Sequence, residues 1–125
     1  MRILVCGGRN YLSYNKLKIT LEDLFNEIWL KDNNEVITII SGESIGADYL
    51  SKVLAYDEWG DSDQVFYEGY PAWWRRYGKA AGSIRNQKML DEGNPDLVVV
   101  FQGGNDTKDM VNKARSAGVE VMEIE

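Results

Sequence analysis

The sequence predicts a single α/β domain over residues 1–125, a Rossmann-like three-layer sandwich built on a parallel sheet of about five strands. Short apolar and β-branched runs alternate with segments of helical periodicity, a pattern typical of right-handed crossovers between parallel strands. The run at residues 97–101 is apolar on both faces, as a central parallel strand requires. We expect the strand order 3-2-1-4-5, with the strand at residue 97 beside the first strand.

The first half of the chain supplies two strands and two helices. Residues 3–6 form a short apolar strand that stops at two glycines. Apolar residues recur at helical spacing over residues 14–30 and predict an amphipathic helix. Residues 36–40 are a β-branched run that predicts the second strand, and a second helical pattern covers residues 47–59.

The second half repeats this alternation. Residues 64–67 predict a weaker third strand and residues 80–92 a helix. After the strand at residue 97, Thr107 is the expected N-cap of another helix, and Gly118 suits the position just beyond the end of that helix. Residues 119–124 predict the final strand.

Composition excludes several classes of site. The chain has no histidine, which removes the usual general base and the usual zinc ligand, so we expect no metal and no cofactor. Its single cysteine, Cys6, cannot form an internal disulfide, and no apolar run is long enough to span a membrane. We expect a cytoplasmic protein. The net charge of −6 disfavours nucleic acid as a partner.

Three glycine-containing loops follow predicted strands. Ligands bind outside the carboxyl ends of the strands of open parallel sheets, and glycines let the backbone approach a ligand closely. Two of the loops lead into helix N-termini, which favour anions. Ordinary turn chemistry is the alternative explanation for these glycines. The ligand-binding residues predicted here are Gly7, Gly8 and Arg9, then Ser41, Gly42, Glu43, Gly46, Ala47 and Asp48, and finally Gly103, Gly104, Asn105, Asp106 and Thr107.

A basic segment at residues 69–90 contains no Asp or Glu, although the chain is acidic. Such segregation creates a positive field suited to a phosphate. We expect Arg85 to fork onto a phosphate near Gly103 and Gly104 through two charge-assisted hydrogen bonds. The alternative is a solvated helix face with aromatic residues packed beneath it. This segment adds Trp74, Gly82, Arg85 and Asn86 to the predicted ligand-binding residues.

Four motifs together resemble the YspA-like branch of the SLOG superfamily. They are GGR at residues 7–9, GAD at 46–48, W-x3-G-x-AAG-x-x-RN-x-x-M at 74–89, and VVVF-x-GG-x-x-T-x-x-MV-x-x-A at 98–114. That superfamily includes DNA-processing protein A and the LOG (lonely guy) phosphoribohydrolases. The resemblance implies a Rossmann-like fold that binds a nucleotide or a nucleotide-derived ligand.

The chain departs from the motif of the LOG enzymes in the stretch that starts at Gln102. Those enzymes carry PGG-x-GT-x-x-E, whose final glutamate is catalytic. Here Met110 stands at the glutamate position, and Asp106 replaces a glycine. LOG-type phosphoribohydrolase activity is therefore not expected.

We consider three functions. The leading hypothesis is a sensor, carrier or sequestering protein for a nucleotide-derived, ADP-ribose-like small molecule. The first alternative is a hydrolase of an N-glycosidic or phosphoester bond, with Asp48, Glu43 or Asp106 as acid or base. The second alternative is single-stranded nucleic-acid binding of the DNA-processing protein A type.

Three aromatic residues lie beside arginines in the basic segment. Trp73, Trp74 and Tyr77 would stack bases in a nucleic-acid-binding protein, which is the feature that favours that alternative. In the leading hypothesis the same residues leave an apolar patch that is large for a monomer. Related superfamily members form dimers, so we expect a homodimer. Arg75 and Arg76 are expected to be charges at the rim.

Overall fold

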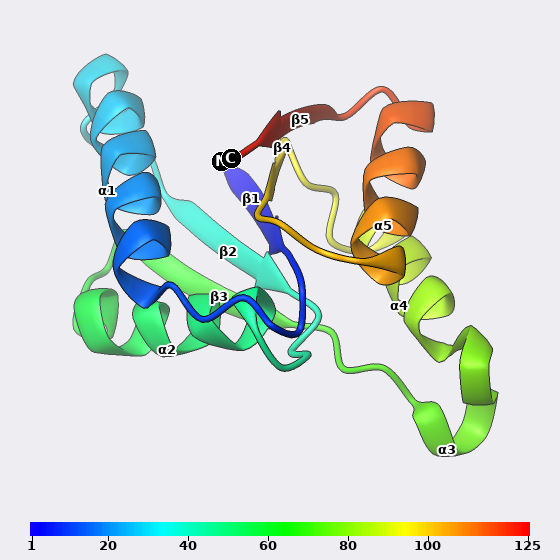
Figure 1. Ribbon diagram of the computed structural model, residues 1–125. Coiled ribbons are helices and arrows are strands. Elements are labelled where there is room, and N and C mark those ends of the chain that lie inside the picture. The colour runs from blue at the N-terminus through cyan, green and yellow to red at the C-terminus, as the bar shows by residue number, and fades with distance from the viewer.

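Five parallel strands form one sheet in the order β3-β2-β1-β4-β5, in a computed structural model that describes residues 1–125 (Figure 1). This confirms the predicted order, with β4 beside β1 and paired with it from Ile3↔Leu97 to Cys6↔Val100. The strands are β1 (Arg2–Cys6), β2 (Ile37–Ser41), β3 (Val65–Gly69), β4 (Leu97–Val100) and β5 (Glu120–Glu123).

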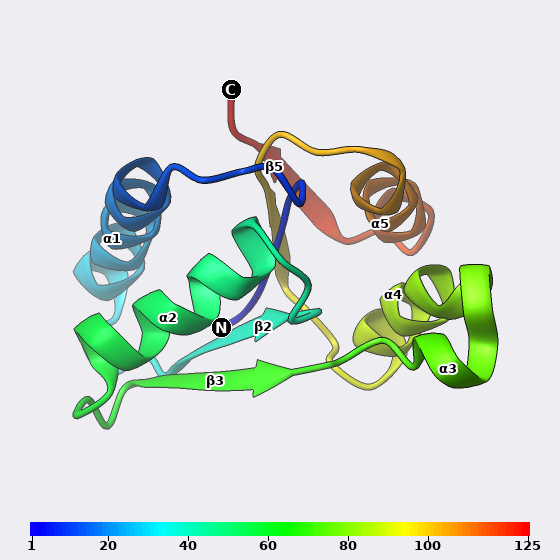
Figure 2. The same ribbon diagram turned by 60° about the horizontal axis from the view of Figure 1, so that its bottom comes forward.

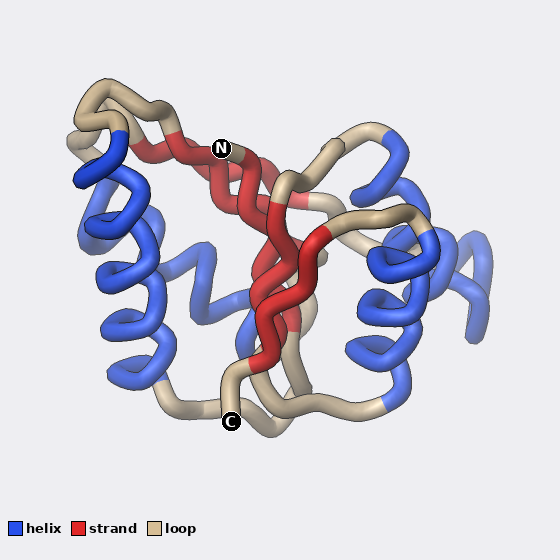
Figure 3. Tube along the Cα trace, turned by 90° about the horizontal axis from the view of Figure 1, so that it is seen from above, coloured by secondary structure: helices blue, strands red, loops and turns tan.

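Helices cover both faces of the sheet, which completes the predicted sandwich. α1 and α2 lie on one face, and α4 and α5 lie on the other (Figures 2 and 3). The change of face coincides with the crossover from the edge strand β3 back to β4, as right-handed connections require. The helices are α1 (Tyr14–Lys31), α2 (Ala47–Trp59), α3 (Trp74–Tyr77), the 3-10 turn η1 (Gly78–Ala80), α4 (Ala81–Asp91) and α5 (Asn105–Ser116).

The core has two halves, one on each face of the sheet. Side chains alternate along a strand, so Ile3 and Val5 of β1 pack under α1 and α2, whereas Leu4 and Cys6 pack under α4 and α5. All four are buried, which explains why the strand is apolar on both faces. Burial raises the pKa of the Cys6 thiol, in keeping with a packing role.

The ends of two helices differ from the sequence prediction. The basic segment forms α3 and η1, which project from the rest of the molecule, before α4 begins at Ala81 (Figure 1). Thr107 is not the N-cap of α5: Gly104 occupies the cap position, and Thr107 is buried in the first helical turn with its hydroxyl against Gly103. The helix ends before Gly118, as predicted. No helix is both long and apolar enough to cross a membrane.

Candidate functional site

The loops after β1, β2 and β4 meet at one edge of the sheet. The Gly8 N–H donates to the Gln102 carbonyl at 2.8 Å, which joins the first loop to the third. The Ala47 N–H approaches the Gly8 carbonyl at 3.4 Å, which brings the second loop against the first. The shared location that the sequence predicts for these loops is therefore present.

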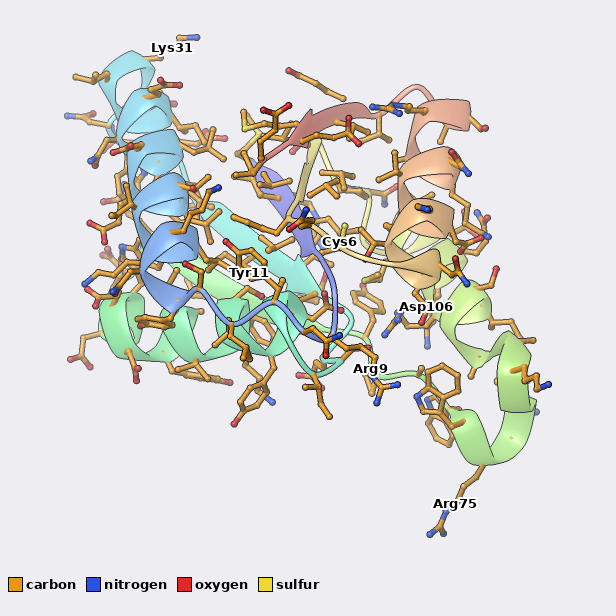
Figure 4. The ribbon with its side chains drawn as sticks, viewed as in Figure 1. Cys6, Arg9, Tyr11, Lys31, Arg75 and Asp106 are labelled. Carbon is orange, nitrogen blue, oxygen red and sulfur yellow. The ribbon has the colours of Figure 1, made fainter.

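A cavity of about 830 Å³ opens where the loops meet, a size within the range typical of small-molecule sites. Figure 4 shows Arg9, Tyr11 and Asp106, which come from opposite sides of this region. The predicted ligand-binding residues that line the cavity are Gly7, Gly8, Arg9, Glu43, Asp48, Trp74, Arg85, Asn86, Gly103, Gly104, Asn105, Asp106 and Thr107.

Other predicted residues lie behind the cavity wall and support the loops. Gly46 has φ +99°, and a Cβ there would lie 2.0 Å from the Gly8 carbonyl oxygen, so this position needs glycine for packing. The Ser41 hydroxyl bonds to the Tyr67 hydroxyl and to the Asp48 carbonyl. The residues predicted to bind ligand that do not line the cavity are Ser41, Gly42, Gly46, Ala47 and Gly82.

Asp48 lies in the first turn of α2 and lines the cavity, with only 5% of its surface exposed. Its Oδ1 atom is buried and has no hydrogen-bond partner in the chain. Burial raises the pKa of the Asp48 carboxyl from 3.8 to about 7, although the Arg85 charge and the backbone N–H groups of Ser44, Gly7 and Gly42 oppose the rise. The carboxyl of Asp48 therefore titrates near neutral pH and lies in the lining of the cavity.

Tyr11 contributes the second buried polar atom that lacks a partner. Its ring packs against Phe101, with ring centroids 5.1 Å apart, while its hydroxyl is buried and makes no hydrogen bond. Tyr11 also lines the cavity. Sequence reasoning missed this residue because a lone tyrosine after a glycine loop has no distinctive spacing. The two buried side-chain polar atoms without a partner thus belong to residues, Tyr11 and Asp48, that line the same cavity.

Arg85 is buried in the cavity wall, but it does not have the predicted geometry. Nη1 donates to the Gly42 carbonyl at 2.6 Å and to Ser44 Oγ at 3.3 Å, and Nε donates to Asn86 Oδ1 at 3.0 Å. A two-nitrogen fork needs Nη2 together with Nη1 or Nε, and both of those are engaged. The expected fork near Gly103 and Gly104 is therefore wrong. Only Nη2 makes no hydrogen bond within the chain and stays available to a ligand.

Asn86 connects α4 to α5 and fixes Arg85. Its Nδ2 donates to the Asp106 carbonyl and to Asp109 Oδ2, each at 3.0 Å, while its Oδ1 accepts from Arg85. The Asp109 carboxylate also accepts from Lys113 at 2.7 Å. Asn86 lines the cavity, but its amide is already used by the protein, so its geometry suits positioning Arg85.

The N-terminus of α5 presents unpartnered backbone donors to the cavity. No acceptor in the chain bonds the N–H groups of Asn105, Asp106 and Thr107, and no side chain caps the helix. All three residues line the cavity. The first N–H groups of a helix carry the positive end of its dipole, so this wall is suited to an anion.

The two remaining acidic candidates differ in their contacts. The Glu43 carboxylate accepts from Lys52 at 3.1 Å and from the Tyr67 hydroxyl at 3.2 Å. Asp106 places its carboxylate against Gly82 at the start of α4, where a Cβ would lie 2.9 Å from Oδ1. Both residues line the cavity, yet Asp48 is the acid that has a buried oxygen without a hydrogen-bond partner.

Exposed apolar side chains also line the cavity. Leu12 is 79% exposed, Ile45 65% and Trp74 51%, and they come from the β1–α1 loop, the β2–α2 loop and α3. Neither Leu12 nor Ile45 was predicted from the sequence. The buried lining residues include polar ones such as Asp48 and Arg85, and these three exposed ones are apolar. The cavity therefore suits a ligand that has a polar part and a planar apolar part.

No cluster of three or more Cys, Asp or Glu side chains is placed to hold a metal ion. The chemistry available to the site therefore comes from backbone N–H groups, one free guanidinium nitrogen, a buried carboxyl and a buried phenol. Comparison of the chain with known protein families, with curated proteins and with solved structures found no match.

Proposed function

We propose that this protein binds a nucleotide-derived, phosphate-bearing small molecule of the ADP-ribose type, as a sensor, carrier or sequestering protein. The observation that carries the proposal is that Asp48 and Tyr11, whose Oδ1 and hydroxyl are buried without a hydrogen-bond partner, both line one cavity. Leaving a buried polar group unpaired costs free energy, and a ligand that bonds to these atoms would recover it. Membership of the YspA-like branch of the SLOG superfamily is part of the same proposal.

The phosphate is assigned to the wall formed by the start of α5. Three free backbone N–H groups, at Asn105, Asp106 and Thr107, meet there at the positive end of a helix of 12 residues. Arg85 adds a buried positive charge to the same cavity. Asp106 turns its carboxylate toward Gly82, so its negative charge is partly compensated by the start of α4.

The planar ring of the ligand is assigned to the exposed apolar side chains. Trp74 offers an indole face for stacking, and Leu12 and Ile45 supply further apolar contacts. A cavity of about 830 Å³ has room for a nucleotide. This arrangement supports a ligand that joins a phosphate to an aromatic base.

Substitution of Gly104 tests the phosphate assignment with two variants whose side chains cap the same N–H groups and differ in charge. This residue is the N-cap of α5, and a Cβ there meets nothing within 4 Å. Asp and Asn are both good N-cap residues, so neither Gly104→Asp nor Gly104→Asn should destabilise the helix. The two variants differ by one negative charge beside the proposed phosphate.

Titration calorimetry with AMP and ADP-ribose should show that Gly104→Asp binds at least about tenfold more weakly than Gly104→Asn. The difference should shrink as salt is added, because salt screens the repulsion. Equal affinities in the two variants would show that the phosphate does not bind at the start of α5.

Hydrolysis of a nucleotide is a second candidate, and one observation favours it. The pKa of the Asp48 carboxyl, raised by burial to about 7, is suited to general acid–base chemistry. In such a reaction water would add across the bond between the sugar and the base, which yields free adenine and ribose 5-phosphate from AMP. Met110 occupies the position of the LOG glutamate, so we expect no adenine release at a LOG-like rate. Adenine release that disappears in Asp48→Asn would promote this candidate.

A further inference from the structure

We infer that Asp48 recognises a sugar hydroxyl of the ligand, which donates a hydrogen bond to Oδ1. This inference rests on the proposed function and adds a specific discrimination to it, namely a ribonucleotide over its deoxy forms. Its starting point is Oδ1 of Asp48, a buried acceptor without a hydrogen-bond partner on a residue that lines the cavity.

When Asp48 is ionised, Oδ1 only accepts, so the ligand group that meets it must supply a hydrogen-bond donor. A fully ionised phosphate cannot do so, because all its oxygens are then acceptors, and its charge repels a carboxylate. A metal ion would need further carboxylate or thiolate ligands, and the chain places no such cluster. The remaining donors on a nucleotide are sugar hydroxyls and amino groups of the base.

A hydroxyl fits Asp48 better than an amino group, because Asp48 exists in two forms. Near pH 7 the carboxyl is partly ionised and partly protonated. A hydroxyl donates to the ionised form and accepts from the protonated form, whereas an amino group only donates. The charged and titratable groups that influence Asp48 are Arg85 of α4, Cys6 of β1 and Tyr67 of β3, and only Arg85 is charged near pH 7.

The position of Asp48 also favours the sugar, which lies between the phosphate and the base in a nucleotide. The carboxyl is in the first turn of α2, beneath the glycine loop after β1, whose N–H at Gly7 faces it. The free N–H groups of α5 belong to one wall of the cavity, and the exposed side chain of Trp74 belongs to another element, α3. A ligand in contact with both walls holds its sugar between them, in the cavity that Asp48 also lines.

The test compares AMP with 2′-deoxy-AMP and 3′-deoxy-AMP by titration calorimetry, using the wild-type chain, Asp48→Ala and Asp48→Asn. The wild type should bind AMP about tenfold or more tightly than at least one deoxy form, the scale of a hydrogen bond to a charged group. In Asp48→Ala this preference should fall to about twofold or less, with little change in affinity for the disfavoured deoxy form. Asp48→Asn keeps an acceptor oxygen and should retain part of the preference.

Equal binding of all three nucleotides to the wild type overturns the inference and leaves the proposed function standing. A preference that persists unchanged in Asp48→Ala overturns it in the same way, because another residue then reads the hydroxyl. Absence of binding by AMP and ADP-ribose alike overturns the proposed function itself, and this inference with it. Should Asp48→Ala not fold, the wild-type comparison and Asp48→Asn decide the question.

Discussion

Nη1 of Arg85 donates a hydrogen bond of 2.6 Å to the carbonyl of Gly42, which ties α4 to the loop that follows β2. The guanidinium fills the space beside Gly42, where a Cβ would lie 2.4 Å from Nη1. Arg85, which belongs to the basic segment, therefore forms part of the cavity wall. Its predicted role as a free phosphate fork gives way to a role in which only Nη2 is available to a ligand.

Gly42→Ala should displace Arg85, because the new methyl group occupies the position of Nη1. We expect the free energy of unfolding to fall by roughly 1–3 kcal/mol, the scale of hydrogen bonds lost by a charged group. Urea denaturation provides the measurement. Gly104→Ala is the control, since a Cβ there meets nothing within 4 Å; it should lower stability by about 1 kcal/mol or less, because alanine is a poorer N-cap than glycine. Equal losses in the two variants would show that Arg85 does not constrain position 42.

Arg85→Ala should weaken AMP binding far more than Arg75→Ala. Arg85 is a buried cavity residue, so its loss should cost roughly 2–4 kcal/mol of binding free energy. Arg75 is exposed on α3 and points away from the rest of the molecule (Figure 4), so its loss should cost less than about 1 kcal/mol. Calorimetric titration of both variants compares them directly. Small, equal losses would mean that the buried guanidinium does not contribute to binding.

Asp48→Asn should change how stability depends on pH. Burial raises the pKa of the Asp48 carboxyl from 3.8 to about 7, so the folded chain binds this proton more tightly than the unfolded chain does. The free energy of unfolding of the wild type should therefore decrease as pH rises from about 4 to about 7, by up to roughly 3–4 kcal/mol from this group.

The variant lacks this titration, so its stability relative to the wild type should increase over the same pH interval. Urea denaturation of both chains at pH 5 and pH 8 gives the comparison, and the pH 8 samples should show the larger gain for Asp48→Asn. Parallel pH profiles for the two chains would show that the Asp48 pKa is not raised.

Trp73, Trp74 and Tyr77 should form the contact of a homodimer. All three are exposed on the projecting segment around α3, with 63%, 51% and 40% of their surfaces accessible. Light scattering at high micromolar concentration should give twice the mass of the chain, and Trp73→Ser should shift the mass toward the monomer. Leu30→Ser is a control, because Leu30 is 87% exposed at the far end of α1. A wild-type chain that is monomeric by light scattering would contradict the prediction.

Periodicity was enough to predict the helix faces, because each helix buries a face that is visible in the sequence. The strand order was predicted from the alternation of strands and helices, which is typical of a Rossmann-like domain. The three loops were predicted to meet for the same reason, since parallel strands end at one edge. The direction of a long side chain is different. Arg85 points to Gly42 because Asn86, itself held by Asp106 and Asp109, fixes the guanidinium, and such contacts between distant segments leave no local spacing to detect.

Two further differences have local causes. Thr107 was expected to cap α5, but the glycine at 104 takes the cap position and lets the helix start earlier. Tyr11 was not predicted, because its role depends on a buried hydroxyl that only packing against Phe101 reveals. Asp48 was predicted as a site acid, although its raised pKa depends on burial that the sequence does not specify.

Native mass spectrometry of the intact chain, incubated with AMP, ADP-ribose, adenosine and inorganic phosphate in separate samples, tests the central claim most directly. The proposed site joins an anion-binding wall to exposed apolar side chains, so AMP or ADP-ribose should form a one-to-one adduct for each chain. Adenosine and inorganic phosphate, which each lack one part of the ligand, should bind more weakly. Absence of an adduct with either nucleotide, at concentrations up to about 1 mM, would contradict the claim that this cavity is a nucleotide site.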